Sequence, residues 1–348
     1  MAKESLEAFA NNPDVINVSY EQPRFFKRVF ANFLDIIFLF LAFVSVFIVV
    51  EKIVQVTPAY QEADQVVARY REESGLFEYS SSRKTWENVS TWLDNNDDTS
   101  YDFRVNKCQK SINNYINYIK AKGTQDDYET IVKDYDEARL SMNMKDEKNN
   151  PLFIKVEEEG ISKIVHNPNA VANSEYYYNH FYREYTLTNC GGFMITVFPE
   201  YHDALSQMSN MLFFIQIPIA ALLGGFIVYL LPALIFKRGR CTFGKKLMQI
   251  GLVDSRVLSP SFGRYLARWA IFFFLEVVLS FFTFGIPFII SFTMMAFTKR
   301  KQGFPDFMLG LVEVDTNKQK IYFDKYEVAL EHVNDHKDPV DFEMEKDI

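Results

Sequence analysis

The chain has 348 residues, a formal net charge of −8 and 34 phenylalanines among its 48% hydrophobic residues, yet its mean hydropathy is only −0.10. Strongly apolar segments must therefore alternate with polar, acidic ones, and the length allows a membrane part together with one soluble domain. An acidic balance of this kind argues against nucleic acid as a partner.

The first apolar run, residues 30–56, is long enough to cross a bilayer. We expect residues 1–29 to form a cytoplasmic segment and the run to act as an uncleaved signal anchor. Arg28 and Asp35 lie seven residues apart, about two helical turns, so they share one face of this helix. An acid inside a membrane helix costs roughly 2.5–3.5 kcal/mol, so Asp35 requires a partner, a water-filled cavity or a functional role.

Residues 57–207 are rich in acidic side chains and are too long and too patterned for a loop. Their periodicity predicts three helices and two strands, over 63–73, 104–122, 128–143, 151–157 and 192–198. We therefore expect an inserted extracytoplasmic α+β domain. Its Tyr-rich run, residues 175–182, is either a ligand platform or, as is more common, a set of half-buried packing residues.

Cys108 and Cys190 both fall in this expected outer domain, where a disulfide is permitted, and the sequence leaves open whether they are bridged. Cys241 falls in an expected cytoplasmic loop and should stay a free thiol. The histidines lack the spacing of a metal site, and no nucleophile and base can be paired from sequence. We expect no metal, no cofactor, no catalytic residues and no enzymatic activity.

A second apolar run, residues 208–236, precedes a strongly basic loop, residues 237–268. Basic loops face the cytoplasm, which places the loop inside and the long acidic insert outside. Arg240, Lys245 and Lys246 in this loop are either lipid headgroup anchors, the commoner case, or phosphate ligands. Two short apolar runs, Ile250–Val253 and Leu309–Val314, are expected to pair as strands.

A third apolar stretch, residues 269–298, is interrupted by a turn signal at Gly285–Pro287. It is either one kinked span or a hairpin. We expect the hairpin, because it returns the basic residues that follow to the cytoplasm with the tail, residues 299–348. Its arms are short for full spans at 1.5 Å per residue. Glu276 lies inside the first arm. The expected fold is an α-helical membrane bundle of three to four hydrophobic segments.

Several stretches resemble the RDD family of bacterial membrane proteins, which is named for an arginine and two aspartates. The stretches are Arg28-x-x-Ala31-x-x-x-Asp35, Thr242-x-Gly244-Lys245-Lys246-Leu247, and Asp306-x-x-x-Gly310. Pro305 stands where the family usually has histidine, and the long insert is not covered. The resemblance implies a multi-pass cell-membrane protein with both termini cytoplasmic and a transport role, including sodium–proton exchange.

We expect Arg28, Asp35 and Asp306 to meet in one cluster near the cytoplasmic side. That cluster is either an ion-pair latch or a cation or proton site, and Glu276 is a further ion-binding candidate. Two functions remain open. The first is a transport or cation/proton exchange component. Four membrane segments make only a thin wall around a pathway, so we expect such a transporter to be a homo-oligomer. The second is a non-transporting adaptor or envelope sensor whose outer domain binds a protein or other ligand. Both functions require membrane lipid.

Overall fold

The computed structural model describes residues 21–96, 99–158, 161–254, 258–297, 301–324 and 326–328. Residues 1–20 of the predicted N-terminal segment and residues 329–348 of the predicted tail lie outside the described residues. Contacts divide the chain into two compact units. The membrane unit comprises residues 1–51 and 216–348, and the inserted unit comprises residues 52–215.

Two helical segments are long and apolar enough to cross a membrane. The first is α2 (Phe25–Gln55), and the second is a continuous run over Pro199–Ile235. The run consists of α9 (Pro199–Met211), η4 (Leu212–Gln216), α10 (Ile217–Gly225), η5 (Phe226–Leu230) and α11 (Leu231–Ile235), where η marks π-helical turns. The two predicted spans therefore coincide with helices of suitable length.

Helices α2 and α10 approach each other at Gly224. A Cβ atom at this position would lie 3.3 Å from the backbone nitrogen and Cα of Phe43 on α2. The absence of a side chain lets the two backbones come together, as is usual where membrane helices pack. Close packing of the two helices is thus the role of Gly224.

The third apolar stretch folds back on itself. A helical arm made of α13 (Phe262–Ile271), η6 (Phe272–Val278) and α14 (Leu279–Phe282) ends at a turn, and α15 (Ile286–Phe297) follows. The rings of Phe272 and Phe288 on the two arms lie 6.4 Å apart. The chain thus reverses direction here, with the turn two residues earlier than the sequence predicts.

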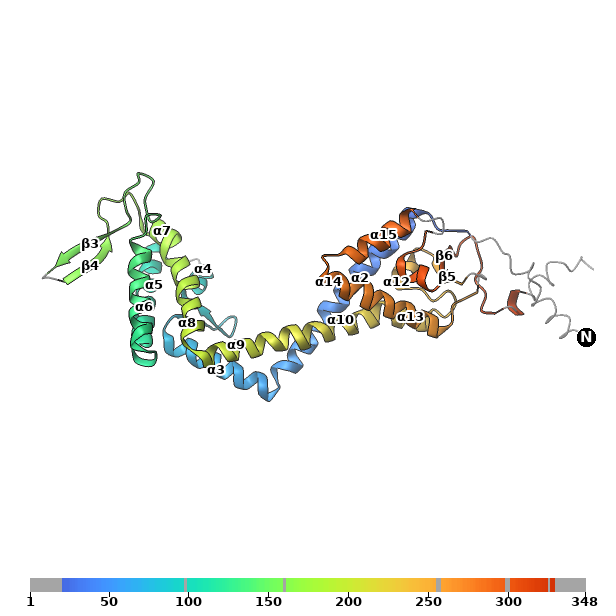
Figure 1. Cartoon of the computed structure of the whole chain (residues 1–348), viewed down its shortest axis with the longest axis horizontal. Coiled ribbons are helices and arrows are strands. Elements are labelled where there is room, and N and C mark those ends of the chain that lie inside the picture. Colours follow the sequence, from blue (N-terminus) through green and yellow to red (C-terminus); the bar gives the residue numbers. More distant parts are fainter. Residues whose placement is uncertain are drawn as a thin grey trace, which may run out of the picture. The chain divides into compact units, whose positions relative to one another are not determined.

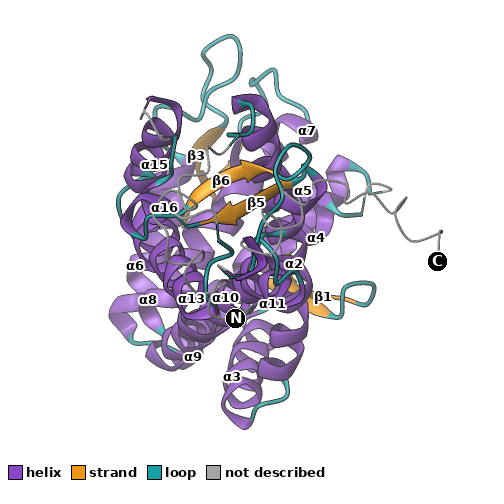
Figure 2. Ribbon diagram, turned by 90° about the vertical axis from the view of Figure 1, so that its right-hand side faces the viewer, coloured by secondary structure: helices purple, strands orange, loops and turns teal. Residues whose placement is uncertain are grey.

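A small two-stranded sheet completes the membrane unit. The strands β5 (Ile250–Val253) and β6 (Val312–Asp315) pair antiparallel, with Ile250 opposite Asp315 (Figure 2). The predicted pairing is confirmed. Two short helices flank the strands, α12 (Phe243–Leu247) before β5 and α16 (Phe304–Met308) before β6.

The inserted unit is mostly helical and has its own core. Figure 1 shows α3 beside α9 and α5 beside α6. Its elements before α9 are α3 (Pro58–Ser74), β1 (Phe77–Ser80), β2 (Thr85–Asn88), α4 (Val89–Asp94), α5 (Tyr101–Lys122), α6 (Gln125–Arg139), β3 (Phe153–Glu158), β4 (Ile161–His166), α7 (Ser174–Tyr177), η2 (Tyr178–Tyr182), η3 (Tyr185–Cys190) and α8 (Gly191–Val197). The strands form two separate antiparallel hairpins, β1–β2 and β3–β4.

Sequence patterns predicted three helices of this unit, α3, α5 and α6, and its strand at residues 151–157. The strand predicted over 192–198 is wrong, because these residues form the helix α8. Its apolar residues were compatible with either structure, since a short apolar run has no decisive period. The Tyr-rich run is largely core: Tyr177, Tyr178, Phe181 and Tyr182 are buried.

Cys108 and Cys190 are both fully buried and carry free thiols, so the disulfide that the sequence allowed is not formed. Burial raises the pKa of Cys108 to about 12 and also raises the pKa of Cys190. Both thiols are therefore protonated and poorly reactive at neutral pH.

Candidate functional site

Arg28 is held by Glu313 on strand β6. Its Nε donates to Glu313 Oε2 at 2.5 Å, and its other nitrogen donates to the backbone carbonyl of Lys301. Lys245 Nζ lies 2.6 Å from the second oxygen, Glu313 Oε1. All three side chains are about 3–6% exposed. Burial opposes ionisation of Glu313, but the charges of Lys245 and Arg28 outweigh it and hold the pKa of Glu313 well below its usual range.

Asp35 caps the short helix α12. Its Oδ1 accepts the backbone N–H of Gly244 at 2.8 Å, and its Oδ2 accepts the hydroxyl of Thr242 at 2.5 Å. Thr242 is also the N-cap of α12, since its oxygen accepts the N–H of Lys245. A Cβ at Gly244 would lie 2.3 Å from the carbonyl oxygen of Ala31, so only glycine lets α12 approach α2 this closely.

Asp306 pairs with Arg268 in a two-point ion pair. Arg268 Nε lies 2.5 Å from Asp306 Oδ1, and its terminal nitrogen lies 3.1 Å from Oδ2. Such fork-like pairing fixes direction as well as position. It joins the start of the hairpin, on α13, to the segment that follows it, on α16.

Arg28, Asp35 and Asp306 therefore do not pair with one another. Each has a different partner, because strand β6 brings a third carboxylate, Glu313, against the arginine. We call these three contacts the latch. The contacts of Glu313 and of Asp306 are ion pairs, and that of Asp35 consists of hydrogen bonds. Together these connect α2, α12, α13, α16 and β6.

Lys245 is not free to anchor a lipid headgroup, because it is buried and paired with Glu313. Arg240 donates to the carbonyls of Pro260 at 2.7 Å and Ala233 at 3.2 Å, so it ties the loop to the end of the second span. Lys246 is exposed, with its Nζ above the ring of Phe236, and for this residue headgroup contact stays a prediction.

Glu276 lies in the π-helical turn η6 and is only 4% exposed. The hydroxyl of Ser291 on the other hairpin arm forms a hydrogen bond with the carboxyl group of Glu276, while the Oε1 atom of Glu276 has no hydrogen-bond partner. The neighbouring Ser280 hydroxyl and Trp269 indole N–H are also buried without partners. Arg268, on the same helical arm as Glu276, forms its ion pair with Asp306. The unsatisfied oxygen of this acid and two further unsatisfied groups on the same helical arm mark a site that differs from the paired latch.

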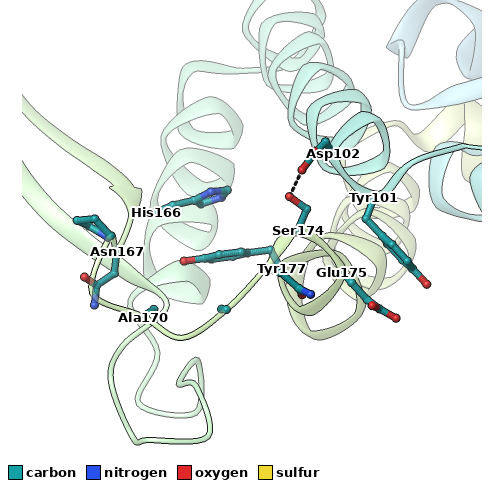
Figure 3. Close-up of a pocket in the computed structure, with 11 residues that line it drawn as sticks. Tyr101, Asp102, His166, Asn167, Ala170, Ser174, Glu175 and Tyr177 are labelled. Atoms are coloured by element: carbon teal, nitrogen blue, oxygen red, sulfur yellow. Dashed lines mark hydrogen bonds between the residues drawn. The ribbon is translucent and has the colours of Figure 1, made fainter.

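A second candidate site is a pocket of about 650 Å³ in the inserted unit (Figure 3). The ring of His166 stacks on Tyr177 at 4.0 Å on one side, and Asp102 accepts a hydrogen bond from Ser174 on the other. Burial and the charge of Arg139 lower the pKa of His166, so its ring is neutral at neutral pH. The lining includes Asp102 and Glu175 but no lysine or arginine, so the pocket is electronegative.

Comparison with known protein families supports the membrane assignment. Residues 187–310 match the RDD family. The match is consistent with an RDD-family protein and, with the two apolar helices, indicates a membrane protein. The RDD match includes the latch residues Lys245, Arg268 and Asp306 as well as Glu276, and it begins after Arg28 and Asp35. The chain matches no curated relative and no solved structure.

Sequence reasoning missed Glu313, the carboxylate on which the latch depends. It also missed the roles of Thr242 and Gly244 as partners of Asp35. One signal was available: a lone acid between Val312 and Val314 breaks an apolar run, which is unusual unless the acid is paired. Nothing in the sequence named the partner, since Arg28 lies 285 positions away.

Proposed function

We propose that the membrane unit transports a proton or a monovalent cation and that Glu276 is the titrating carboxyl group. The observation that carries the proposal is the unpartnered, buried Oε1 of Glu276. Ionisable residues within membrane helices are expensive and commonly mark ion pathways. The π-helical turn that holds Glu276 is a second supporting feature, since such turns are frequent at functional sites.

The latch residues have a different role in this proposal. Arg28, Asp35 and Asp306 each have complete polar partners, so they hold the helices in register and do not exchange ions. This assignment predicts that Asp35 substitutions impair folding, whereas Glu276 substitutions impair flux in a folded protein.

The test is cation-driven proton flux in proteoliposomes that contain the whole chain or its Glu276→Gln variant. Glu327→Gln is the matched control, because Glu327 is a carboxylate of the same unit in a surface ion pair with Arg238. We expect a sodium- or potassium-driven pH change that Glu276→Gln abolishes and Glu327→Gln retains. Flux no greater than in protein-free liposomes across the neutral pH range contradicts the proposal.

A second candidate function is a membrane-anchored binding module or sensor. The observation that favours it is the electronegative pocket of the inserted unit, whose size suits a small ligand. The two carboxylates of the lining, Asp102 and Glu175, favour a cationic ligand such as a polyamine. Calorimetric titration of the whole chain with spermidine tests this function. Saturable binding that Glu175→Gln weakens supports it, and the absence of saturable heat contradicts it.

A further inference from the structure

The turn of the hairpin is apolar and points away from the protein. Phe284 is 99% exposed, Phe282 is 72% exposed and Ile286 is 55% exposed. No charged residue occurs between Leu279 and Phe297. A loop that met water would leave three large hydrophobic side chains unshielded there, which soluble surfaces rarely do.

The apolar part of each arm is too short to cross a bilayer. Helix α15 has 12 residues, which at 1.5 Å per residue gives about 18 Å. The apolar part of the first arm, from Trp269 to Phe282, reaches only about 21 Å by the same rule. The hydrocarbon core is about 30 Å thick, and α2, with 31 residues, exceeds it easily. The tip therefore ends about two-thirds of the way across.

Three backbone N–H groups at the turn form hydrogen bonds within the hairpin, which lowers the cost of placing this backbone in hydrocarbon. The N–H of Thr283 donates to Leu279 O at 3.0 Å, that of Gly285 to Ser280 O at 2.9 Å and that of Ile286 to Thr283 O at 3.2 Å. The Thr283 hydroxyl donates to Leu279 O at 2.7 Å. Backbone polar groups in hydrocarbon must be satisfied within the protein, and these bonds satisfy three N–H groups of the turn.

The two feet of the hairpin are held together. The Arg268–Asp306 ion pair joins the start of the first arm, on α13, to helix α16 after the second arm. The N–H of Phe304 also donates to the Ser291 hydroxyl on α15 at 3.0 Å. Charged groups at both feet and none at the tip place entry and exit on the same membrane surface.

We propose that residues 269–297 form a re-entrant hairpin, whose tip at Phe284 rests among lipid acyl chains and does not reach the opposite aqueous phase. This membrane contact is independent of the transport proposal, since it depends on length, exposure and hydrogen bonding at the turn. It gives the membrane unit two complete spans and one partial insertion.

The test is the depth of a spin label at Phe284→Cys in the whole chain, labelled in detergent and reconstituted into liposomes. Background labelling should be low, because Cys108, Cys190 and Cys241 are all buried. Phe214→Cys on the second span, where Phe214 is 77% exposed, is the control for lipid contact. Met142→Cys in the inserted unit, where Met142 is 85% exposed, is the control for water. Phe282→Cys is a second tip variant.

We expect both tip labels to collide with oxygen several-fold more often than with a water-soluble nickel chelate, as at Phe214 and opposite to Met142. A tip label that collides mainly with nickel overturns the proposal, because it would show a hairpin that crosses the membrane. Low collision with both reagents also overturns it, because another copy of the chain would then cover the tip. Since the tip side chains contact little protein, neither substitution should prevent folding.

Discussion

Glu313 shows how a single buried carboxylate organises two distant cations. Its two oxygens are divided between Arg28 on the first span and Lys245 after the second. With one anion and two cations, the group keeps a net positive charge in a largely dry environment. Such a group is stable only while each hydrogen bond is present, because an unpaired buried charge is far more costly than a paired one.

Glu313→Gln should therefore destabilise the protein by about 3–5 kcal/mol, since it leaves two buried cations without an anion. Thermal unfolding in nanodiscs measures the effect. Lys246→Gln is the control, because Lys246 neighbours Lys245 in sequence but is exposed, and it should change little. A Glu313→Gln protein as stable as the parent would mean that Arg28 and Lys245 reach water.

The stability of the inserted unit should depend on pH through Asp146. Burial alone would raise its pKa, but hydrogen bonds from Asn150, from the Val171 N–H and from the Lys148 N–H hold the pKa at about 2. A lowered pKa stabilises the folded state above the unfolded pKa of about 3.9, and this stabilisation is lost as the pH falls from there toward 2.

The measurement is the difference in melting temperature between the parent and Asp146→Asn. We expect a large difference at neutral pH that shrinks as the pH falls below about 4, because the parent then loses its own charge. A difference that stays constant down to the folded pKa would show that the carboxylate charge does not stabilise this loop.

At the scale of elements, the docking of α12 against α2 depends on the absence of a side chain. Asp35 and Thr242 supply the hydrogen bonds, while Gly244 supplies the space. The short helix would otherwise be held off the first span by a methyl group 2.7 Å from Asp35 Oδ1. The steric fit at Gly244 and the hydrogen bonds of Asp35 thus act at the same contact between α12 and α2.

Gly244→Ala should destabilise the protein by about 1–3 kcal/mol, as overpacking of a close contact does. Gly263→Ala on α13 is the matched control: a Cβ there meets nothing within 4 Å, and alanine favours a helix over glycine by roughly 0.5–1 kcal/mol. Denaturation of both variants in the same detergent compares them. Equal stability of the two variants would contradict close docking of α12.

Phe284→Asn tests whether the turn of the hairpin lies in lipid or in water, by whether the melting temperature falls or rises. Phe284 has a φ of 51°, in the left-handed region that asparagine adopts more readily than phenylalanine. In water the substitution should stabilise the turn, but in hydrocarbon the amide is costly. We expect a lower melting temperature in nanodiscs, and a higher one would indicate a tip in water.

At the scale of the whole molecule, the inserted unit has a core that does not draw on the membrane unit. Tyr115, Ile112, Leu93 and Met194, contributed by α4, α5 and α8, are completely buried within it. A module of about 150 residues buries enough apolar surface to fold by itself. Independent folding is what a binding module requires and what a simple loop would lack.

Residues 57–207 expressed alone should therefore unfold cooperatively in detergent-free buffer, as followed by circular dichroism. Ile112→Ala in that fragment should lower its stability by about 2–5 kcal/mol, because Ile112 has no exposed surface. A gradual melt that Ile112→Ala does not alter would show that this core forms only in the whole chain.

The sequence alone determined the local features of this protein. The length of the apolar runs predicted α2 and most of the 199–235 run, and the helical period predicted α3, α5 and α6. The turn signal at Gly285–Pro287 indicated a chain reversal but left one kinked span open. These features depend on neighbouring residues, and so they can be derived from periodicity and composition. The short apolar run at α8 was misassigned for the same reason, since its structure depends on what it packs against.

Only the tertiary structure decided which charges meet. Arg28, Asp35 and Asp306 stand out in the sequence, but Glu313, Thr242 and Arg268 are their partners, brought from far along the chain by β6, α12 and α13. The unsatisfied Oε1 of Glu276 and the pocket beside His166 likewise exist only after folding. Pairing of charges depends on distances in space, which a linear pattern of residues does not contain.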